Sequence, residues 1–302
     1  MARSTTTLPD DLVSAEWLLL NLEEPSVQVV DIRGYVRTEN LGGGRQTATY
    51  EGAMDEYLLG HIPGATFIDW TRDIVDSDAE ATAQIANPEQ FASALGSAGV
   101  DADTDVVIVD HAGGHFATRL WWALRYYGHD RVAILDGGFK HWESLGLPIE
   151  AGKHTPEPKS FVVDVHPHWW SGAADVAALI ERSDRQIIDA RDPETYAGAS
   201  QRGSRGGHIP TASNLPTKDL FKSDGRWKDP EELRLAAAAS GVDLNQPVTA
   251  YCNGGVTATA VLFGLHRAGM EDLSNYDGSW NEWSERPDLP VEGNRDLWRD
   301  NT

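Results

Sequence analysis

The stretch VTAYCNGGVTATAVLFGLHRAG, residues 248–269, contains the single cysteine of the chain, Cys252. Four residues typical of a buried strand precede the thiol. After it comes an apolar segment with helical spacing, which ends at Gly269, a common helix stop. Gly254 and Gly255 separate the thiol from this segment. The stretch therefore predicts a strand, a glycine turn that carries the thiol, and a helix.

The same pattern occurs earlier in the chain, and so do its neighbours. Four pairs of blocks align in the same order: 27–34 with 185–192, 60–67 with 207–214, 105–128 with 246–269, and 133–150 with 274–292. Agreement of this kind indicates a duplicated domain. The segment EAGKHTPEPKS (150–160) is rich in proline, glycine and charge, which is typical of a linker. We expect one domain over residues 1–152 and a second over 160–302.

Strands alternate with helices in both halves. The strand-like runs VQVVDI, DVVIVD and VAILD are apolar on consecutive residues, which indicates strands covered on both faces. Such alternation predicts two α/β domains, each with a parallel sheet and right-handed crossovers. Reactive groups in these sheets lie at the carboxyl ends of strands, where Cys252 is expected.

Composition excludes several classes of partner. The 302 residues carry 47 acidic and 25 basic side chains, a net charge of −22, which repels nucleic acid and anionic membranes. This charge fits adaptation to high salt or an ordinary acidic surface, and the two explanations remain open. No apolar run approaches the roughly 20 residues of a membrane span. One cysteine closes no intrachain disulfide, and the start MARSTTTLPDD does not read as a leader, so we expect a cytoplasmic protein.

The predicted turn offers an environment in which a thiol ionises. A thiol with its ordinary pKa of about 8.5 is mostly protonated at neutral pH. The first-turn amides of a helix lack intrahelical partners, and the helix dipole adds partial positive charge. Because Gly254 and Gly255 allow positive φ, the amides from Asn253 to Thr257 can form an anion-binding nest around the sulfur. The alternative is that Cys252 is a small buried apolar residue.

Four motifs in order carry a family resemblance: GHIPGA (60–65), RGGHIP (205–210), CNGGVTA (252–258) and YDGSWNEW (276–283). On them the chain resembles the tandem-domain rhodanese-type sulfurtransferases over nearly its whole length. The resemblance implies two domains, each with a five-stranded parallel sheet flanked by helices, and an active site in the second half facing the interdomain cleft. It also implies that no cofactor and no metal are needed.

The resemblance further implies a reaction in two steps. Cys252 attacks the outer sulfur of a donor, releases sulfite or pyruvate, and becomes a persulfide. Cyanide, a small thiol or a thiol-bearing sulfur-acceptor protein then takes the sulfur. The first half has Asp110 and His111 where Cys252 is expected, and neither side chain carries a sulfane sulfur. We therefore interpret the first half as structural.

The family's donors are anions, so a cationic clamp is expected. Arg191 matches the family's arginine after the second-domain strand, where a guanidinium can grip an oxyanion. The alternative is an ion pair of Arg191 with Asp189 or Asp192. Arg205, or failing that Arg202, is the second candidate clamp, and both can equally be solvated loop charges. The remaining candidate substrate contacts are the loop residues Asn253, Gly254, Gly255, Val256 and Thr257.

The donor itself stays open between thiosulfate and 3-mercaptopyruvate. Members of the thiosulfate type carry basic residues after the cysteine, and members of the mercaptopyruvate type carry small neutral ones that include a serine. Asn253 and Gly254 are neutral, which leans towards mercaptopyruvate, but the serine is missing. His61 matches a histidine proposed for a relay with that serine, but we favour the alternative that it is a hydrogen-bonded turn residue, a role it shares with His208.

Two other functions compete with sulfur transfer. Dual-specificity phosphatases place a cysteine at a similar loop, but they need an arginine six positions later, where this chain has Ala258. Alternatively, Cys252 serves as a persulfide carrier or sensor with little turnover of small molecules.

The motif YDGSWNEW is interpreted as structural. Asp277 and Trp280 are expected to hold the last turn of the sheet near the loop. Trp280 and Trp283 are expected to pack in the core, and the alternative is that they form a wall of the pocket.

Overall fold

Each half of the chain forms a five-stranded parallel sheet in the computed structural model, which describes residues 7–79, 81–111 and 114–293. The first sheet has the order β1 (Leu12–Val13), β7 (Val132–Leu135), β6 (Asp105–Val109), β2 (Val27–Asp31), β5 (Thr66–Phe67). The second has the order β8 (Trp170–Ser171), β13 (Leu273–Tyr276), β12 (Val248–Tyr251), β9 (Gln186–Asp189), β11 (Ser213–Asn214). The two orders correspond strand for strand, which confirms the predicted α/β fold with two parallel sheets.

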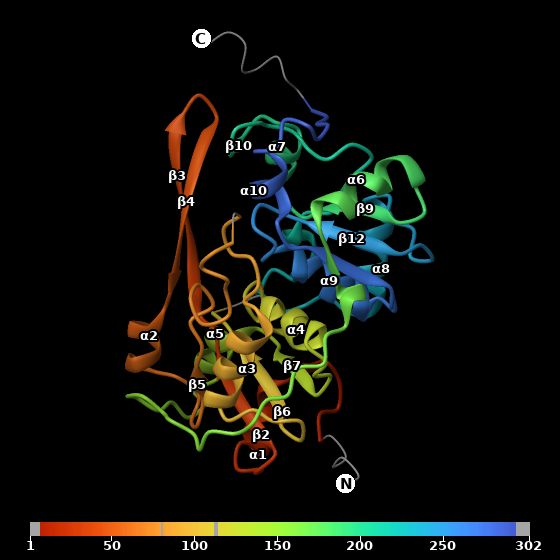
Figure 1. Cartoon of the computed structure of the whole chain (residues 1–302). Helices are drawn as coiled ribbons and strands as arrows, with labels where there is room; N and C mark the ends of the chain where they lie inside the picture. Colours follow the sequence, from red (N-terminus) through yellow and green to blue (C-terminus); the bar gives the residue numbers. More distant parts are fainter. Residues whose placement is uncertain (1–6, 80, 112–113, 294–302) are drawn as a thin grey trace.

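Helices flank both sheets (Figure 1). In the first half they are α1 (Ala15–Asn21), α2 (Met54–Leu59), α3 (Pro88–Ser97), α4 (Ala117–Tyr126) and α5 (Gly138–Ser144). The second half has α6 (Ala173–Arg182), α7 (Pro193–Tyr196), α8 (Pro230–Ala239), α9 (Ala258–Arg267) and α10 (Ser279–Trp283), with 3₁₀ turns at Pro167–Trp169 and Thr217–Leu220. Local sequence sets several starts: Asn87 caps α3 and Asp229 caps α8, each followed by a proline at the first helical position.

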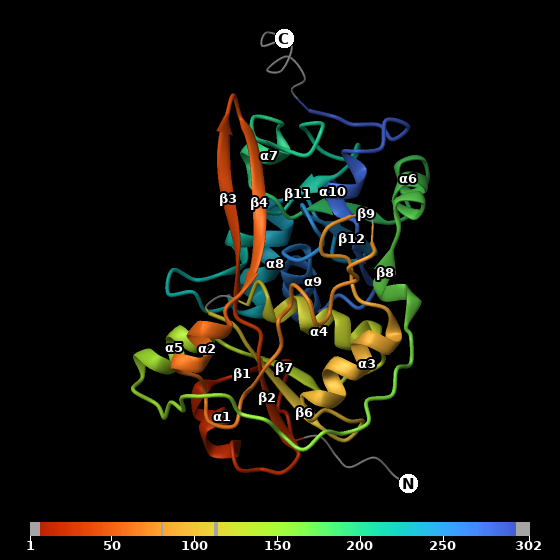
Figure 2. The same ribbon diagram turned by 60° about the vertical axis from the view of Figure 1, so that its left-hand side comes forward.

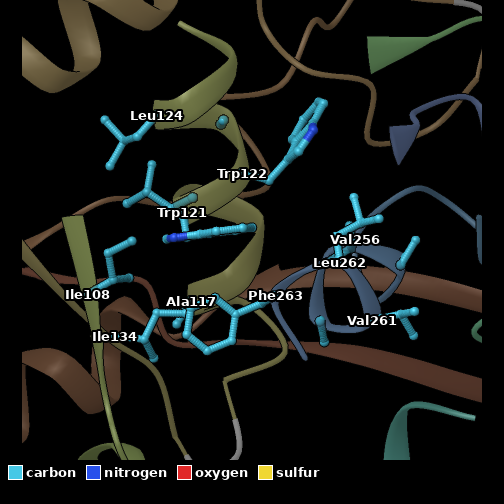
Figure 3. Packing of buried hydrophobic residues seen from close by; sticks show 14 of the residues in the cluster. Ile108, Ala117, Trp121, Trp122, Leu124, Ile134, Val256, Val261, Leu262 and Phe263 are labelled. Atoms are coloured by element: carbon cyan, nitrogen blue, oxygen red, sulfur yellow. The ribbon is translucent and has the colours of Figure 1, made fainter. Parts of the chain in front are cut away.

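Helices α4 and α9 form the centre of the molecule. The first eight residues of each, 117–124 and 258–265, are all buried, as expected of a helix that is covered on every side. The two helices contact each other through Trp121 and Phe263, whose rings lie 5.0 Å apart edge to face (Figure 3). Thr259 also donates a hydrogen bond of 3.0 Å to Thr118. The two domains therefore share one apolar core.

A long hairpin links the domains on one side. Strands β3 (Gly34–Gly42) and β4 (Arg45–Gly52) pair antiparallel, and β4 also pairs in parallel with β10 (Gln201–Arg202) of the second half. Figures 1 and 2 both show this hairpin rising from the first domain beside the second. Arg202, one of the candidate clamps, donates to Thr38 of the hairpin at 2.9 Å. The hairpin is a connection between domains that the sequence analysis does not predict.

The segment between the domains is extended along the first domain. Residues 152–166 contain no helix or strand, and the amides of Lys159, Asp164 and His166 donate to carbonyl groups of first-domain residues. The division of the chain at residues 152–160 stays a prediction. Within the described residues, no helix has the length and apolar character that crossing a membrane requires.

Candidate active site

Cys252 is the first residue after β12, the central strand of the second sheet. Its amide donates to the Ser279 hydroxyl at 3.1 Å, and its carbonyl accepts from the Trp280 amide at 3.0 Å. The Asn253 carbonyl accepts from the Asn281 amide at 2.8 Å. These bonds tie both residues to the start of α10 and fix where the turn leaves the sheet. The strand, turn and helix lie where the sequence predicts them.

The first domain covers the turn. Cys252 is only 2% exposed and belongs to the central apolar core. A methyl group added to Gly254 would lie 3.2 Å from the Tyr50 hydroxyl, 3.3 Å from the Thr82 carbonyl and 3.1 Å from the side-chain nitrogen Nδ2 of Asn281. Tyr50 comes from the hairpin strand β4, so groups of the first domain lie directly against the glycine turn that follows Cys252.

The turn carries a set of unused hydrogen-bond donors. In the part of the chain that the structure describes, the amides of residues 253–258 donate to no protein acceptor. Gly255 has a φ of +71°, a backbone conformation that residues other than glycine adopt only with strain. Buried amides without acceptors are rare in proteins, and a cluster of them indicates a place where an anion binds.

The first-domain turn shows what these donors do when an anion is present. In the sheet registers Val109 pairs with Asp31 and Tyr251 with Asp189, so the next residues, Asp110 and Cys252, are equivalent. The Asp110 carboxylate accepts hydrogen bonds from three amides of its own turn, those of Gly114 (3.2 Å), Phe116 (3.0 Å) and Ala117 (3.2 Å).

Counted back from the helix starts at Ala117 and Ala258, these three donors correspond to Gly255, Thr257 and Ala258. Gly114 and Gly255 share a positive φ, of +79° and +71°. In the first domain, the Asp110 carboxylate is therefore the anion that the turn amides bind. In the second domain, the equivalent position holds the Cys252 thiol, and the corresponding amides have no acceptor among the described residues. This pair of turns supports the nest that the sequence analysis places around the sulfur.

Loss of the Asp110 carboxylate is expected to destabilise the first domain. Asp110→Ala leaves two buried amides and one partly buried amide without an acceptor, which costs about 2–4 kcal/mol of unfolding free energy. Urea unfolding measures the change. Asp103→Ala, at an exposed position in the preceding turn, is the matched control and is expected to stay within about 0.5 kcal/mol of wild type. Equal stability of the two variants would contradict an anion-holding role of the turn.

Arg191 is engaged inside the second domain. Its guanidinium pairs with Asp189 at 2.6 Å and donates to the Gly207 carbonyl at 2.8 Å. Burial alone would lower the pKa of Arg191, but the Asp189 carboxylate and the Tyr251 hydroxyl together outweigh burial, and the pKa is raised. In the first half, Arg33 makes the same pair with Asp31 and a 2.7 Å bond to the Gly60 carbonyl. An arrangement present in both domains favours the ion pair over the clamp.

Arg205 ties the loop before the GHIP motif to the end of the domain. It donates to four backbone carbonyls at 2.6–2.9 Å, those of Trp283, Ser284, Arg286 and Leu289. A guanidinium with this many partners is neither a solvated loop charge nor placed to hold a substrate without rearrangement. Its role as a substrate contact stays a prediction that these bonds do not favour.

The two histidines of the repeated GHIP motif occupy matching places. His61 shares a 2.9 Å hydrogen bond with the Tyr57 carbonyl and stacks on the Tyr57 ring at 4.0 Å. His208 does the same with Tyr196, at 2.9 Å and 3.8 Å. This duplication supports a turn residue rather than a relay. Trp280 and Trp283 are fully buried in the core.

Several contacts to the turn come from residues that the sequence analysis misses. They are Tyr50 and Arg119 of the first domain, and Asn275 and Ser279 of the second. Arg119 carries a visible signal, since it stands beside the apolar run LWWAL of the helix ATRLWWALRY, where a charged residue is expected to be buried with a partner. Tyr50 has no such signal, because only the fold brings the hairpin to the second domain.

Comparisons with known proteins agree on one family. The rhodanese-like domain matches residues 14–145 and 172–286. The chain is 33% identical over 283 residues to the 3-mercaptopyruvate sulfurtransferase of Escherichia coli K12, covering 93% of this chain and 97% of that protein. The mouse thiosulfate sulfurtransferase is 33% identical over 285 residues, with coverages of 91% and 92%. The crystal structure of the E. coli 3-mercaptopyruvate sulfotransferase superposes with a TM-score of 0.79 at 31% identity, covering 89% of this chain and 98% of that one.

Proposed function

This chain belongs to the rhodanese-like sulfurtransferases, and from that premise we propose that it moves a sulfane sulfur from a small anionic donor to a thiophilic acceptor through a persulfide on Cys252. Cys252 is the only residue of its type in the chain, so no second thiol competes for the role. The observation that carries the proposal is the pair of turns, in which the amides that hold Asp110 in one domain correspond to unused amides beside Cys252 in the other.

The reaction proceeds in two balanced steps. The Cys252 thiolate attacks the outer sulfur of the donor and forms a sulfur–sulfur bond. The bond between that sulfur and the rest of the donor breaks, and its electron pair leaves with sulfite, or with the pyruvate enolate, which takes a proton from water. The terminal sulfur of the persulfide is then attacked by cyanide or a thiolate, and the electron pair of the sulfur–sulfur bond returns to Cys252.

The turn supplies the electrostatics for both steps. The donors Gly255, Thr257 and Ala258 stabilise whichever negative charge occupies the turn, first the thiolate and then the terminal persulfide sulfur. Because these are backbone groups on a fixed turn, they need no reorganisation when charge moves along the sulfur–sulfur bond. The cover formed by the first domain keeps water away from the reactive persulfide.

The donor is proposed to be 3-mercaptopyruvate or thiosulfate, since relatives named for each are similar to this chain to the same degree. The neutral residues Asn253 and Gly254 lean towards 3-mercaptopyruvate. A thiol-bearing acceptor protein and a cytoplasmic location remain parts of the proposal that rest on the sequence alone.

Paired kinetics test the proposal. Pyruvate release from 3-mercaptopyruvate and thiocyanate formation from thiosulfate and cyanide are measured side by side, and intact mass spectra are recorded after each donor alone. We expect the protein to gain one sulfur atom from at least one donor and to turn over with it. Absence of sulfur gain with both donors would overturn the proposal. Gain of sulfur without turnover would instead support the carrier or sensor function.

A further inference from the structure

The carbonyl group of Gly255 is held by two buried donors from different domains. Nη1 of Arg119 and Nδ2 of Asn275 each donate to this oxygen at 3.1 Å. Arg119 lies on α4 of the first domain and is 1% exposed, and Asn275 lies on β13 of the second and is fully buried. Two buried donors on one carbonyl fix the orientation of the whole peptide plane that joins Gly255 to Val256.

The equivalent carbonyl of the first domain is used differently. There the Gly114 oxygen accepts from the Thr118 amide at 2.9 Å, so the turn of the helix closes on itself. In the second domain the corresponding Thr259 amide donates to Val256 instead, at 3.2 Å. The Gly255 carbonyl is thus turned out of its own helix, and Arg119 and Asn275 replace the missing helical bond. The turn that carries the thiol depends on a residue of the other domain for its shape.

Arg119 has further partners that fix its own position. Nη1 pairs with Asp277 at 2.5 Å and Nη2 donates to the Ala83 carbonyl at 2.7 Å. The guanidinium carbon lies 4.7 Å from the centre of the Trp122 ring. The second oxygen of Asp277 accepts from the Ile85 amide at 2.7 Å. Arg119 therefore meets three acceptors with one rigid fork, and it also neutralises a buried carboxylate close to the turn.

We propose that Arg119 is a positioning residue for sulfur transfer: from the first domain, it fixes the Gly255–Val256 peptide, which lies between the Gly255 and Thr257 amides, and so sets the direction in which these amides meet negative charge on the sulfur. This inference rests on the proposed function, because it assigns a role within the same site. It also gives the non-catalytic domain a part in the reaction beyond covering the turn.

The test uses the chain's single thiol. Arg119→Lys keeps the positive charge beside Asp277, but an ammonium group cannot reach all three acceptors of the guanidinium fork. Wild-type and variant proteins are alkylated with iodoacetate and with iodoacetamide, which differ in charge and little in size. The ratio of the iodoacetate rate to the iodoacetamide rate reports how well the turn binds an anion. Because the two reagents are similar in size, differences in access to the buried sulfur affect both rates and cancel in the ratio.

We expect Arg119→Lys to lower the preference for iodoacetate about 10-fold and to slow single-turnover persulfide formation by about 10- to 100-fold. Asn275→Leu removes the second donor to the same carbonyl and is expected to shift the ratio in the same direction. If Arg119→Lys does not fold, the alkylation ratio of Asn275→Leu tests the inference in its place. The matched control is Arg33→Lys, which alters another buried arginine–aspartate pair, that with Asp31, and is expected to keep the wild-type ratio because, among the described residues, Arg33 makes no bond to this turn.

A wild-type ratio and a wild-type persulfide rate in folded Arg119→Lys and Asn275→Leu would overturn the inference. An equal loss of the ratio in Arg33→Lys would also overturn it, since the effect would then be general destabilisation. The proposed function fails separately: a wild-type protein that gains no sulfur from either donor refutes the sulfur transfer itself.

Discussion

Cys252→Ser is expected to gain no sulfur from thiosulfate or 3-mercaptopyruvate and to lose turnover by at least about 1000-fold, to the rate of the uncatalysed exchange. The serine hydroxyl is not ionised at neutral pH, and an oxygen atom does not form the sulfur–sulfur bond that the second step breaks. The measurements are intact mass after incubation with each donor, followed by thiocyanate and pyruvate production. Because serine differs from cysteine by one atom, the variant is expected to fold, with a change in unfolding free energy of about 1–2 kcal/mol at this buried position.

The same variant separates the competing functions. If Cys252 is a carrier or sensor, the wild-type protein gains sulfur but does not turn over, and the serine variant loses only the gain. If Cys252 is a packing residue, neither protein gains sulfur and the two behave alike. Residual turnover in Cys252→Ser within about 10-fold of wild type would contradict nucleophilic catalysis by this residue. Turnover of a phosphate ester by either protein would contradict the exclusion of phosphatase activity, which rests on Ala258.

The sequence predicts the sheets and the turn well because their signals are local. Consecutive apolar residues mark strands covered on both faces, and a glycine pair between a strand and a helix marks the turn. Because the domain is duplicated, the sequence pattern of each element occurs twice, so the two sheets are expected to match strand for strand. The correspondence between Asp110 and Cys252 is also visible in the aligned halves, although the hydrogen bonds of Asp110 are not.

The parts that the sequence does not predict depend on contacts between distant segments. Residues 34–52 are mostly polar and flank three glycines at 42–44, but nothing in them indicates a strand partner in the second domain. Arg191 and Arg205 are predicted to bind the donor, yet their acceptors in the structure are carboxylate and carbonyl groups that only the folded chain brings within reach. The hydrogen bonds of Arg119 and the contact of the Tyr50 hydroxyl with Gly254 cross the domain interface, and sequence periodicity does not indicate which residues meet there.

Gly255→Ala is expected to give the second large loss. The φ of +71° at this position costs an alanine about 1–2 kcal/mol, and its methyl group would lie 2.4 Å from the Asp277 carbonyl oxygen and 3.0 Å from the Asp277 carboxylate. Backbone cannot yield as a flexible side chain does, so the turn must shift and its amides lose their common direction. We expect a stability loss of about 2–4 kcal/mol and persulfide formation slowed by about 100-fold or more, measured in single-turnover experiments on the folded variant.

Gly254→Ala, one residue earlier, is the matched control for this effect. Gly254 is not at positive φ, and two of the three atoms that its methyl group would meet are the ends of the Tyr50 and Asn281 side chains, at 3.2 and 3.1 Å. These ends can rotate away, so the loss in persulfide formation is expected to stay below about 10-fold. If the two alanine variants lose activity equally, bulk at the mouth of the turn limits the reaction. A loss confined to Gly255→Ala instead identifies the shape of the turn as the source of catalysis, because the two substitutions add the same methyl group.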